Sequence, residues 1–183
     1  NIILASVRNF GLDTEGTIML QHASLGFDGS AWEIFMSLVA GAKLCIAGHD
    51  ARVGSGLGRL LREQHVTTAA LVPAVLATVN LESYPDLVTL LVGGEAFPPE
   101  LAATWAPGHR LFNTYGPTEA TINVSLKEHT DQDIGRFPIG RPTDNMKMYI
   151  LDDRLQPVPI GIPGELFIGG IGLARGYLNQ PQL

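Results

Sequence analysis

The chain has 183 residues, 45% of them hydrophobic and 16% charged, and its 12 Lys and Arg against 18 Asp and Glu give a net charge of −6. This composition excludes a disordered chain, and the acidic balance without a basic run argues against nucleic acid and anionic membranes as partners. No apolar run approaches the roughly 18 to 20 residues of a membrane-spanning helix, and the single cysteine, Cys45, excludes an internal disulfide, so we expect a cytoplasmic protein.

Short apolar runs alternate with helix-like stretches through the first two thirds of the chain. In chain order we expect a strand at 17–20, a helix at 30–40, a strand at 43–47, a helix at 57–64, a strand at 67–72, a helix at 73–79, a strand at 87–92, a helix at 98–105 and a strand at 109–113. Ser30 and Glu33 have capping-box spacing at the start of the 30–40 helix, and Gly41 would end it. The alternation predicts a parallel sheet with right-handed crossovers.

The last third of the chain is different in character. Strands are expected at 147–151 and 165–168, and the Pro and Gly residues between them leave no room for a long helix. We therefore place a boundary between residues 126 and 142, with an α/β subdomain at about 1–130 and part of a β-rich subdomain at 131–183. Because the chain opens with Asn1 and has no signal-peptide pattern, we expect it to be part of a longer chain.

Ligands of an open parallel sheet bind beyond the carboxyl ends of its strands. This rule selects four loops, at residues 27–32, 71–73, 93–96 and 113–119. The last of them presents the ring of Tyr115, the hydroxyl of Thr118 and the carboxylate of Glu119, which can stack on a base, bond a phosphate and hold Mg²⁺. The alternative interpretation is a Tyr-Gly-Pro turn followed by a helix that Thr118 caps.

Three segments closely resemble signature motifs of the adenylation domains of nonribosomal peptide synthetases. They are FDGSAWEIF at 27–35, NTYGPTEATI at 113–122 and GELFIGGIGLARGYL at 164–178, and they follow the order of the family. The resemblance covers essentially this whole chain but only about the middle third of a full adenylation domain. It implies a flavodoxin-like α/β parallel-sheet subdomain, followed by the start of a β-rich, barrel-like subdomain.

The resemblance assigns ATP and Mg²⁺ to the loops that follow the later strands. Tyr115 would stack on adenine, Thr118 would contact the α-phosphate and Glu119 would coordinate Mg²⁺, so that Thr118 and Glu119 serve the catalytic step. The same base would be lined by Asn113, Gly94, Glu95 and Ala96.

An amino-acid pocket is also implied, with Asp28 pairing with the α-ammonium group of the substrate. The alternative for Asp28 is a solvated loop residue. The other pocket positions would be Gly29, Trp32, Ala70, Leu91, Gly93, Thr114, Ile122 and Asn123. Several of these are small and none is charged, so we expect a large apolar or aromatic amino acid; Asn123 could reach a polar tip. Trp32 could instead be a core residue on its helix face.

The implied reaction converts an amino acid and MgATP to an aminoacyl adenylate and pyrophosphate. The acyl group would then pass to the phosphopantetheine thiol of a carrier domain, with carrier and condensation domains as partners. Because the phosphate loop, the ribose-binding Asp and the lid Lys of the family lie outside the 183 residues, we expect these residues alone to be inactive. The alternatives are an acyl- or aryl-CoA ligase, which has no use for a carboxylate at position 28, and a non-catalytic substrate-recognition subdomain.

Overall fold

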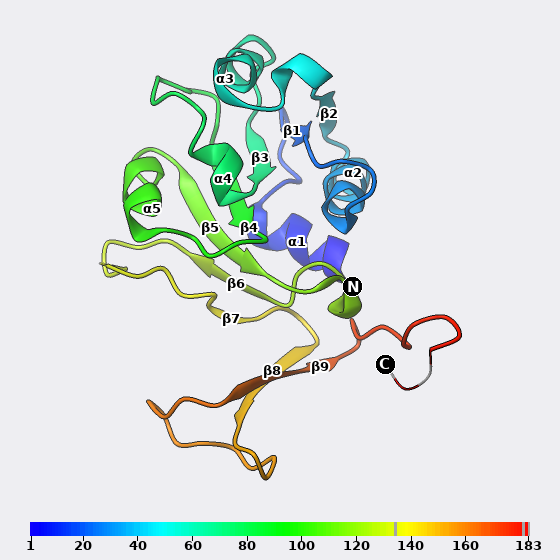
Figure 1. The fold of residues 1–183 in the computed structure, drawn as a ribbon. Coiled ribbons are helices and arrows are strands. Elements are labelled where there is room, and N and C mark those ends of the chain that lie inside the picture. The colour runs from blue at the N-terminus through cyan, green and yellow to red at the C-terminus, as the bar shows by residue number, and fades with distance from the viewer. Residues whose placement is uncertain (134, 181, 183) are drawn as a thin grey trace.

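The computed structural model describes residues 1–133, 135–180 and 182, and its centre is a seven-stranded sheet (Figure 1). The strands are β1 (Ile18–Gln21), β2 (Lys43–Ile46), β3 (Thr68–Leu71), β4 (Thr89–Gly93), β5 (Arg110–Tyr115), β6 (Ser125–Glu128) and β7 (Arg141–Pro142). Their order is β2-β1-β3-β4-β5-β6-β7; the pairs from β2 to β5 are parallel, and β6 and β7 add antiparallel pairs at one edge. The order 2-1-3-4-5 of the parallel strands is that of a flavodoxin-like sheet, which confirms the predicted fold class.

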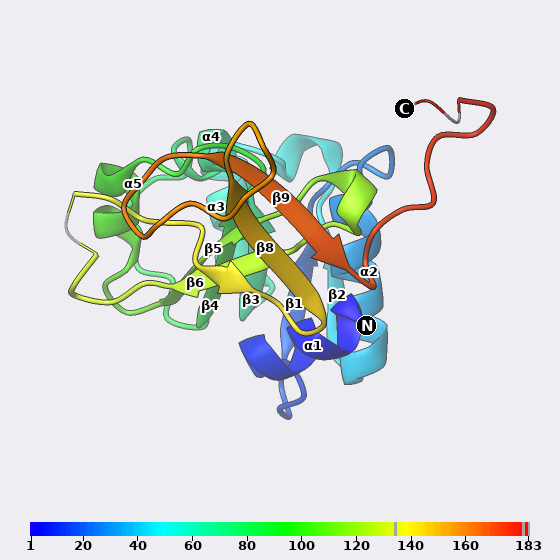
Figure 2. The ribbon, with the colours of Figure 1, turned by 90° about the horizontal axis from the view of Figure 1, so that it is seen from below.

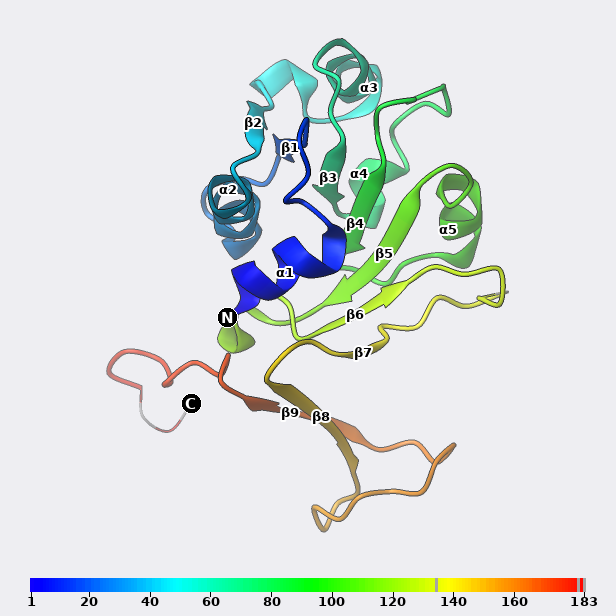
Figure 3. The ribbon, with the colours of Figure 1, turned by 180° about the vertical axis from the view of Figure 1, so that it is seen from behind.

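Helices cover both faces of the parallel part. They are α1 (Ile2–Phe10), α2 (Asp28–Ala40), α3 (Gly54–Glu63), α4 (Pro73–Leu76) and α5 (Pro99–Trp105), with short 3₁₀ turns η1 (His49–Ala51) and η2 (Thr118–Ala120). Figures 1 and 3 show α1 and α2 on one face and α3, α4 and α5 on the other. Among the described residues, no helix combines the length and the apolar composition needed to cross a bilayer.

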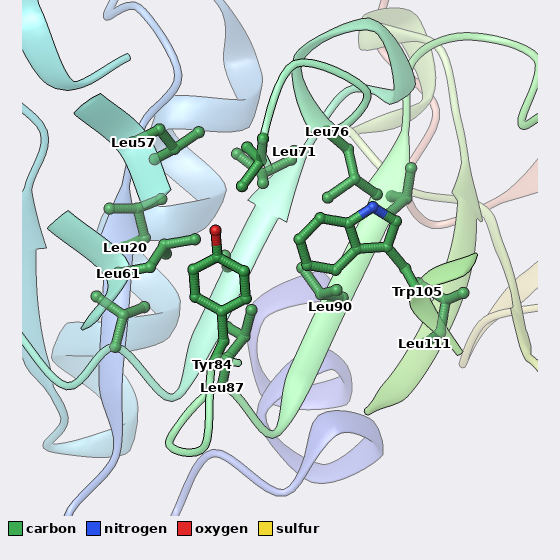
Figure 4. Close-up of a cluster of buried hydrophobic side chains, with 14 of the residues drawn as sticks. Leu20, Leu57, Leu61, Leu71, Leu76, Tyr84, Leu87, Leu90, Trp105 and Leu111 are labelled. Atoms are coloured by element: carbon green, nitrogen blue, oxygen red, sulfur yellow. The ribbon is translucent and has the colours of Figure 1, made fainter. Parts of the chain in front are cut away.

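The two faces of the sheet bury two hydrophobic clusters. On the larger, Leu90 of β4 packs with residues of α3, α4 and α5, and the Tyr84 ring stacks on Trp105 with centroids 5.7 Å apart (Figure 4). On the opposite face, Leu91 packs with residues of α1 and α2. Because both faces are buried, the central strands β3 and β4 read as largely apolar runs in the sequence.

A separate antiparallel hairpin follows the large sheet. Strands β8 (Met146–Leu151) and β9 (Glu165–Gly170) pair along their full lengths and lie side by side, projecting beyond the β7 edge (Figures 1 and 2). The connection to this hairpin is tied to α1, because Asp144 accepts hydrogen bonds from Asn1 and Arg8. The large sheet thus runs to Pro142 and the second sheet begins at Met146; the division of the chain into subdomains at 130/131 stays a prediction.

The structure corrects the predicted capping box. Helix α2 begins at Asp28 rather than Ser30, and Phe27 stands at its N-cap without a side-chain hydrogen bond. Ser30 lies inside the first turn, where its hydroxyl donates to the Phe27 carbonyl at 2.7 Å. The Glu33 carboxylate instead accepts hydrogen bonds from the loop that follows β1. Ser30 and Glu33 therefore have the spacing of a capping box without forming one.

Other differences are smaller. Helix α1 and strands β6 and β7 were not expected, and the helix expected at 73–79 ends at Leu76. Strand β6 carries Lys127 and Glu128, so it lacks the apolar run of a strand that is buried on both faces.

Candidate functional site

A cavity of about 560 Å³ lies at the carboxyl ends of the parallel strands. The chain leaves β1 toward β2 on one side and later returns to β3 on the other. The crevice at such a reversal of strand order is where open α/β sheets bind ligands. The cavity is lined there by the loop after β1 and by the end of β3.

All nine residues predicted for the amino-acid pocket line this one cavity. They are Asp28, Gly29, Trp32, Ala70, Leu91, Gly93, Thr114, Ile122 and Asn123. Of the residues predicted around adenine, Gly94 and Glu95 also line it, whereas Ala96, Asn113 and Tyr115 do not. Thr118 and Glu119, predicted for the α-phosphate and Mg²⁺, do not line it either. The structure therefore brings together the set predicted to select the amino acid, from positions almost one hundred residues apart.

The predicted pocket residue Trp32 belongs both to the cavity wall and to the core. Its ring packs edge-on against Phe10 of α1, and its Nε1–H donates to the Ser6 hydroxyl at 2.9 Å. The Trp32 side chain therefore packs in the core and also lines the cavity; its contact with an amino-acid substrate stays a prediction. Through its own contact with Trp32, α1 supports the cavity wall from behind.

Removing the hydroxyl in the variant Ser6→Ala is expected to lower the free energy of unfolding by about 1 kcal/mol, because the buried Trp32 N–H loses its acceptor. Urea denaturation followed by tryptophan fluorescence measures the change. The double variant Ser6→Ala/Trp32→Phe removes both partners, so its loss should be less than the sum of the two single losses. Additive losses would show that the hydrogen bond contributes nothing.

Asp28 is the first residue of α2 and stands at the cavity with its side chain half-buried. Among the described residues it has no salt-bridge partner. A carboxylate in the first turn of a helix is stabilised by the helix dipole. Asp28 can therefore accept an external cation at the cavity.

The cavity also has ionisable side chains that the sequence did not single out for it: His22, Glu33 and Arg52. Glu33 is 1% exposed, and burial raises its pKa to about 7 despite hydrogen bonds from the Ala23, His22 and Gln21 N–H groups. The sequence carried a signal for the burial of Glu33: it lies three residues before Met36, so both side chains share one face of α2, and that face is buried.

Backbone strain and an unpaired carboxamide occur together where residues 121–123 pass the cavity. Thr121 and Ile122 have φ of 61° and 69°, a left-handed conformation that is unfavourable for β-branched residues. The next residue, Asn123, is buried, and neither polar atom of its carboxamide has a hydrogen-bond partner in the described part of the chain. Both features are typical of places where a protein meets a ligand.

The predicted nucleotide-contacting residues lie beside the cavity, at the end of β5 and in η2. Tyr115 is partly exposed, and the Glu119 carboxylate accepts a hydrogen bond from the Tyr177 hydroxyl. That bond lowers the pKa of Glu119 and raises the pKa of Tyr177. Asn113 points elsewhere, because its amide donates to the Phe137 and Pro138 carbonyls; its contact with adenine stays a prediction.

No cluster of three or more metal-ligating side chains is found among the described residues. A single exposed carboxylate such as Glu119 still fits Mg²⁺, because this ion is commonly held by one or two carboxylates together with the phosphates of a substrate. Glu119 could therefore serve a nucleotide-bound ion, and it would share its carboxylate with Tyr177 or release it.

Comparison with known proteins gives consistent matches over almost the whole chain. The sequence model of the AMP-binding enzyme family, described as "AMP-binding enzyme", matches residues 1–178. The chain is 52% identical over 169 residues to a probable non-canonical nonribosomal peptide synthetase, CymA, of Salinispora arenicola, covering 92% of this chain. It is 48% identical over 184 residues to one component of the linear gramicidin synthase of Brevibacillus parabrevis, covering 100% of this chain. The chain spans 2% of the length of each of these two relatives.

Solved structures show the same fold. The adenylation domain AlmE of Vibrio cholerae, in complex with glycyl-adenosine-5′-phosphate, matches with a TM-score of 0.89 and 28% identity, covering 99% of this chain and 36% of that one. PA1221, a nonribosomal peptide synthetase protein with adenylation and PCP domains, matches with a TM-score of 0.84 and 26% identity, covering 96% of this chain and 38% of that one.

Proposed function

Since the chain belongs to the AMP-binding enzyme family, we propose that it forms the central part of an adenylation domain that activates an amino acid with ATP for nonribosomal peptide synthesis. The observation that carries this proposal is the convergence of all nine predicted pocket residues, Asp28 among them, on one cavity. The relatives among nonribosomal peptide synthetases and the adenylation-domain structures support it.

In the proposed reaction, a carboxylate oxygen of the amino acid attacks the α-phosphorus of ATP, and pyrophosphate leaves. Asp28 holds the α-ammonium group, so the carboxylate points out of the cavity toward the η2 turn. Tyr115 stacks on the base and Thr118 donates a hydrogen bond to the α-phosphate. Mg²⁺, when bound at Glu119, neutralises negative charge on the phosphates. Holding both reactants in line supplies much of the rate.

The proposal extends to partners and location. The aminoacyl group would pass to the phosphopantetheine thiol of a carrier domain, with a condensation domain as the next partner, in the cytoplasm. The match to PA1221, whose own description includes a PCP domain, supports the carrier partner.

ATP–pyrophosphate exchange across the proteinogenic amino acids tests the function. It should be measured on a complete adenylation domain that contains this chain, with the 183 residues alone beside it. We expect exchange with one amino acid or a small related set in the complete domain and none in the 183 residues alone. Exchange driven only by carboxylic acids without an amine would refute the proposal and favour an acyl- or aryl-CoA ligase.

The proposed substrate has a large apolar or aromatic side chain. Leu91, Trp32 and Ile122 provide apolar wall, and the small residues Gly29, Ala70 and Gly93 leave room. The one neutral polar group with no partner there, among the residues that the structure describes, is the Asn123 carboxamide, which suits a side chain with a polar tip.

The variant Asn123→Leu should change this selectivity. Losing one neutral hydrogen bond costs about 1 kcal/mol, or roughly fivefold. We therefore expect the ratio of kcat/KM for tyrosine over phenylalanine to fall about fivefold. Pyrophosphate exchange with these two amino acids measures it. Equal ratios in both proteins would mean that Asn123 does not contact the side chain of the substrate.

A further inference from the structure

Glu33 holds the loop that leaves β1 through an unusual set of contacts. Its carboxylate accepts hydrogen bonds from the backbone N–H of His22 at 3.0 Å and from the backbone N–H of Ala23 at 3.0 and 3.2 Å. The side-chain amide of Gln21 adds a third donor at 3.1 Å and also bonds the Ala23 carbonyl. In these contacts the Glu33 carboxylate thus acts only as a hydrogen-bond acceptor, for two backbone N–H groups and one side-chain amide.

The same loop is held from its other side by Arg52. The Arg52 guanidinium donates to the His22 carbonyl, and the His22 ring nitrogen is 2.7 Å from the Arg52 carbonyl. His22, Ala23, Glu33 and Arg52 all line the cavity. Hydrogen bonds with Glu33 and Arg52 therefore hold this wall of the cavity.

The charge of Glu33 works against folding. Its pKa is about 7 because burial disfavours the ionised form, while the loop donors and the charge of Arg52 favour it only in part. A carboxyl group whose pKa is raised on folding binds protons more readily in the folded state. Stability is therefore lost as the pH rises from about 4.5 to 7. The other ionisable side chains around the cavity are His22, Asp28, Arg52 and Glu95.

We propose that Glu33 is a positioning residue for amino-acid binding: its carboxylate fixes residues 22–24 as one wall of the cavity, acting through the backbone N–H groups of His22 and Ala23. This inference rests on the proposed function. It requires that a variant with an isosteric neutral side chain at position 33 fold as stably as the wild type and yet hold the wall less firmly. A glutamine can accept through only one atom, so its amide group places a donor against one of the loop donors.

The test compares Glu33→Gln with the wild type in a complete adenylation domain. We expect KM for the amino acid to rise on the order of tenfold at pH 8, with kcat changed less than about twofold, because the loop moves while the reacting groups stay. The wild-type KM should rise as the pH falls below 7, and the variant should show no such step. A matched control is Glu63→Gln on α3, an exposed glutamate.

Two readouts do not depend on catalysis. The melting temperature of Glu33→Gln at pH 8 should equal or exceed that of the wild type, and the amides of His22 and Ala23 should exchange hydrogen faster. An unchanged KM, or a lower melting temperature at pH 8, would overturn the positioning role. A wild-type domain without amino-acid-dependent exchange would refute the proposed function instead, whereas the amide exchange would still test the contacts of Glu33.

Discussion

Replacing Asp28 with alanine is expected to lower amino-acid-dependent pyrophosphate exchange severely in a complete adenylation domain. The carboxylate is half-buried at the cavity and has no salt-bridge partner among the described residues, so the substrate ammonium would be its counter-charge. Removing one partner of such a pair costs about 2 to 5 kcal/mol, a loss of roughly 30-fold to 5,000-fold in kcat/KM.

The control for Asp28→Ala is Asp153→Ala, which removes an exposed carboxylate in the turn after β8. This control should exchange like the wild type. A carboxylic acid that lacks the amine should lose nothing in the Asp28→Ala variant, because it has no group for Asp28 to pair with. Unchanged exchange in Asp28→Ala would show that this residue does not bind the ammonium group.

The second large effect is expected on stability, from Gly93→Ala at the end of β4. Gly93 pairs with Thr114 of β5, and a Cβ there would overlap the carbonyl oxygen and hydroxyl of Thr114. The overlap is with backbone, which cannot rotate away, so the two strand ends must separate. We expect the free energy of unfolding to fall by about 2 to 3 kcal/mol, measured by urea denaturation.

Gly29→Ala is the matched comparison, because Gly29 lines the same cavity. A Cβ there would meet Ala23 at 3.7 Å, an ordinary contact, and alanine favours the helix that Gly29 occupies. We therefore expect this variant to be more stable than the wild type by about 0.5 kcal/mol while its cavity becomes smaller. Equal losses in both variants would contradict the account of Gly93.

Elements buried on both faces could be predicted from the sequence. Strand β4 reads Thr-Leu-Leu-Val-Gly and its neighbour β3 reads Thr-Ala-Ala-Leu, because helices pack on each side of them. Helix α1 was not expected, although Val7 and Phe10 are spaced to lie on one buried face of it and Gly11 ends it in a left-handed conformation. Strands β6 and β7 are polar or only two residues long, so their antiparallel pairing depends on the strand beside them.

The candidate site was predicted by resemblance, residue by residue, and the contacts behind it were not. Glu33 has the spacing of a capping box with Ser30, yet its partners are backbone groups of a loop ten or more residues earlier. Asn113 stands in a motif, but two carbonyl groups some 25 residues later hold its amide. Nothing local in a sequence specifies such partners, because the fold brings them together.

Every described residue that lines the cavity falls within one uninterrupted stretch of chain, from His22 to Asn123. Under the proposed function, exchanging this stretch for that of a relative should therefore transfer the choice of amino acid, while the flanking segments keep their own sequence. The stretch still depends on one residue outside it, because the Ser6 hydroxyl accepts a hydrogen bond from Trp32. A stretch that carries tryptophan at position 32 would keep this hydrogen bond only in a recipient chain with a hydroxyl side chain at position 6.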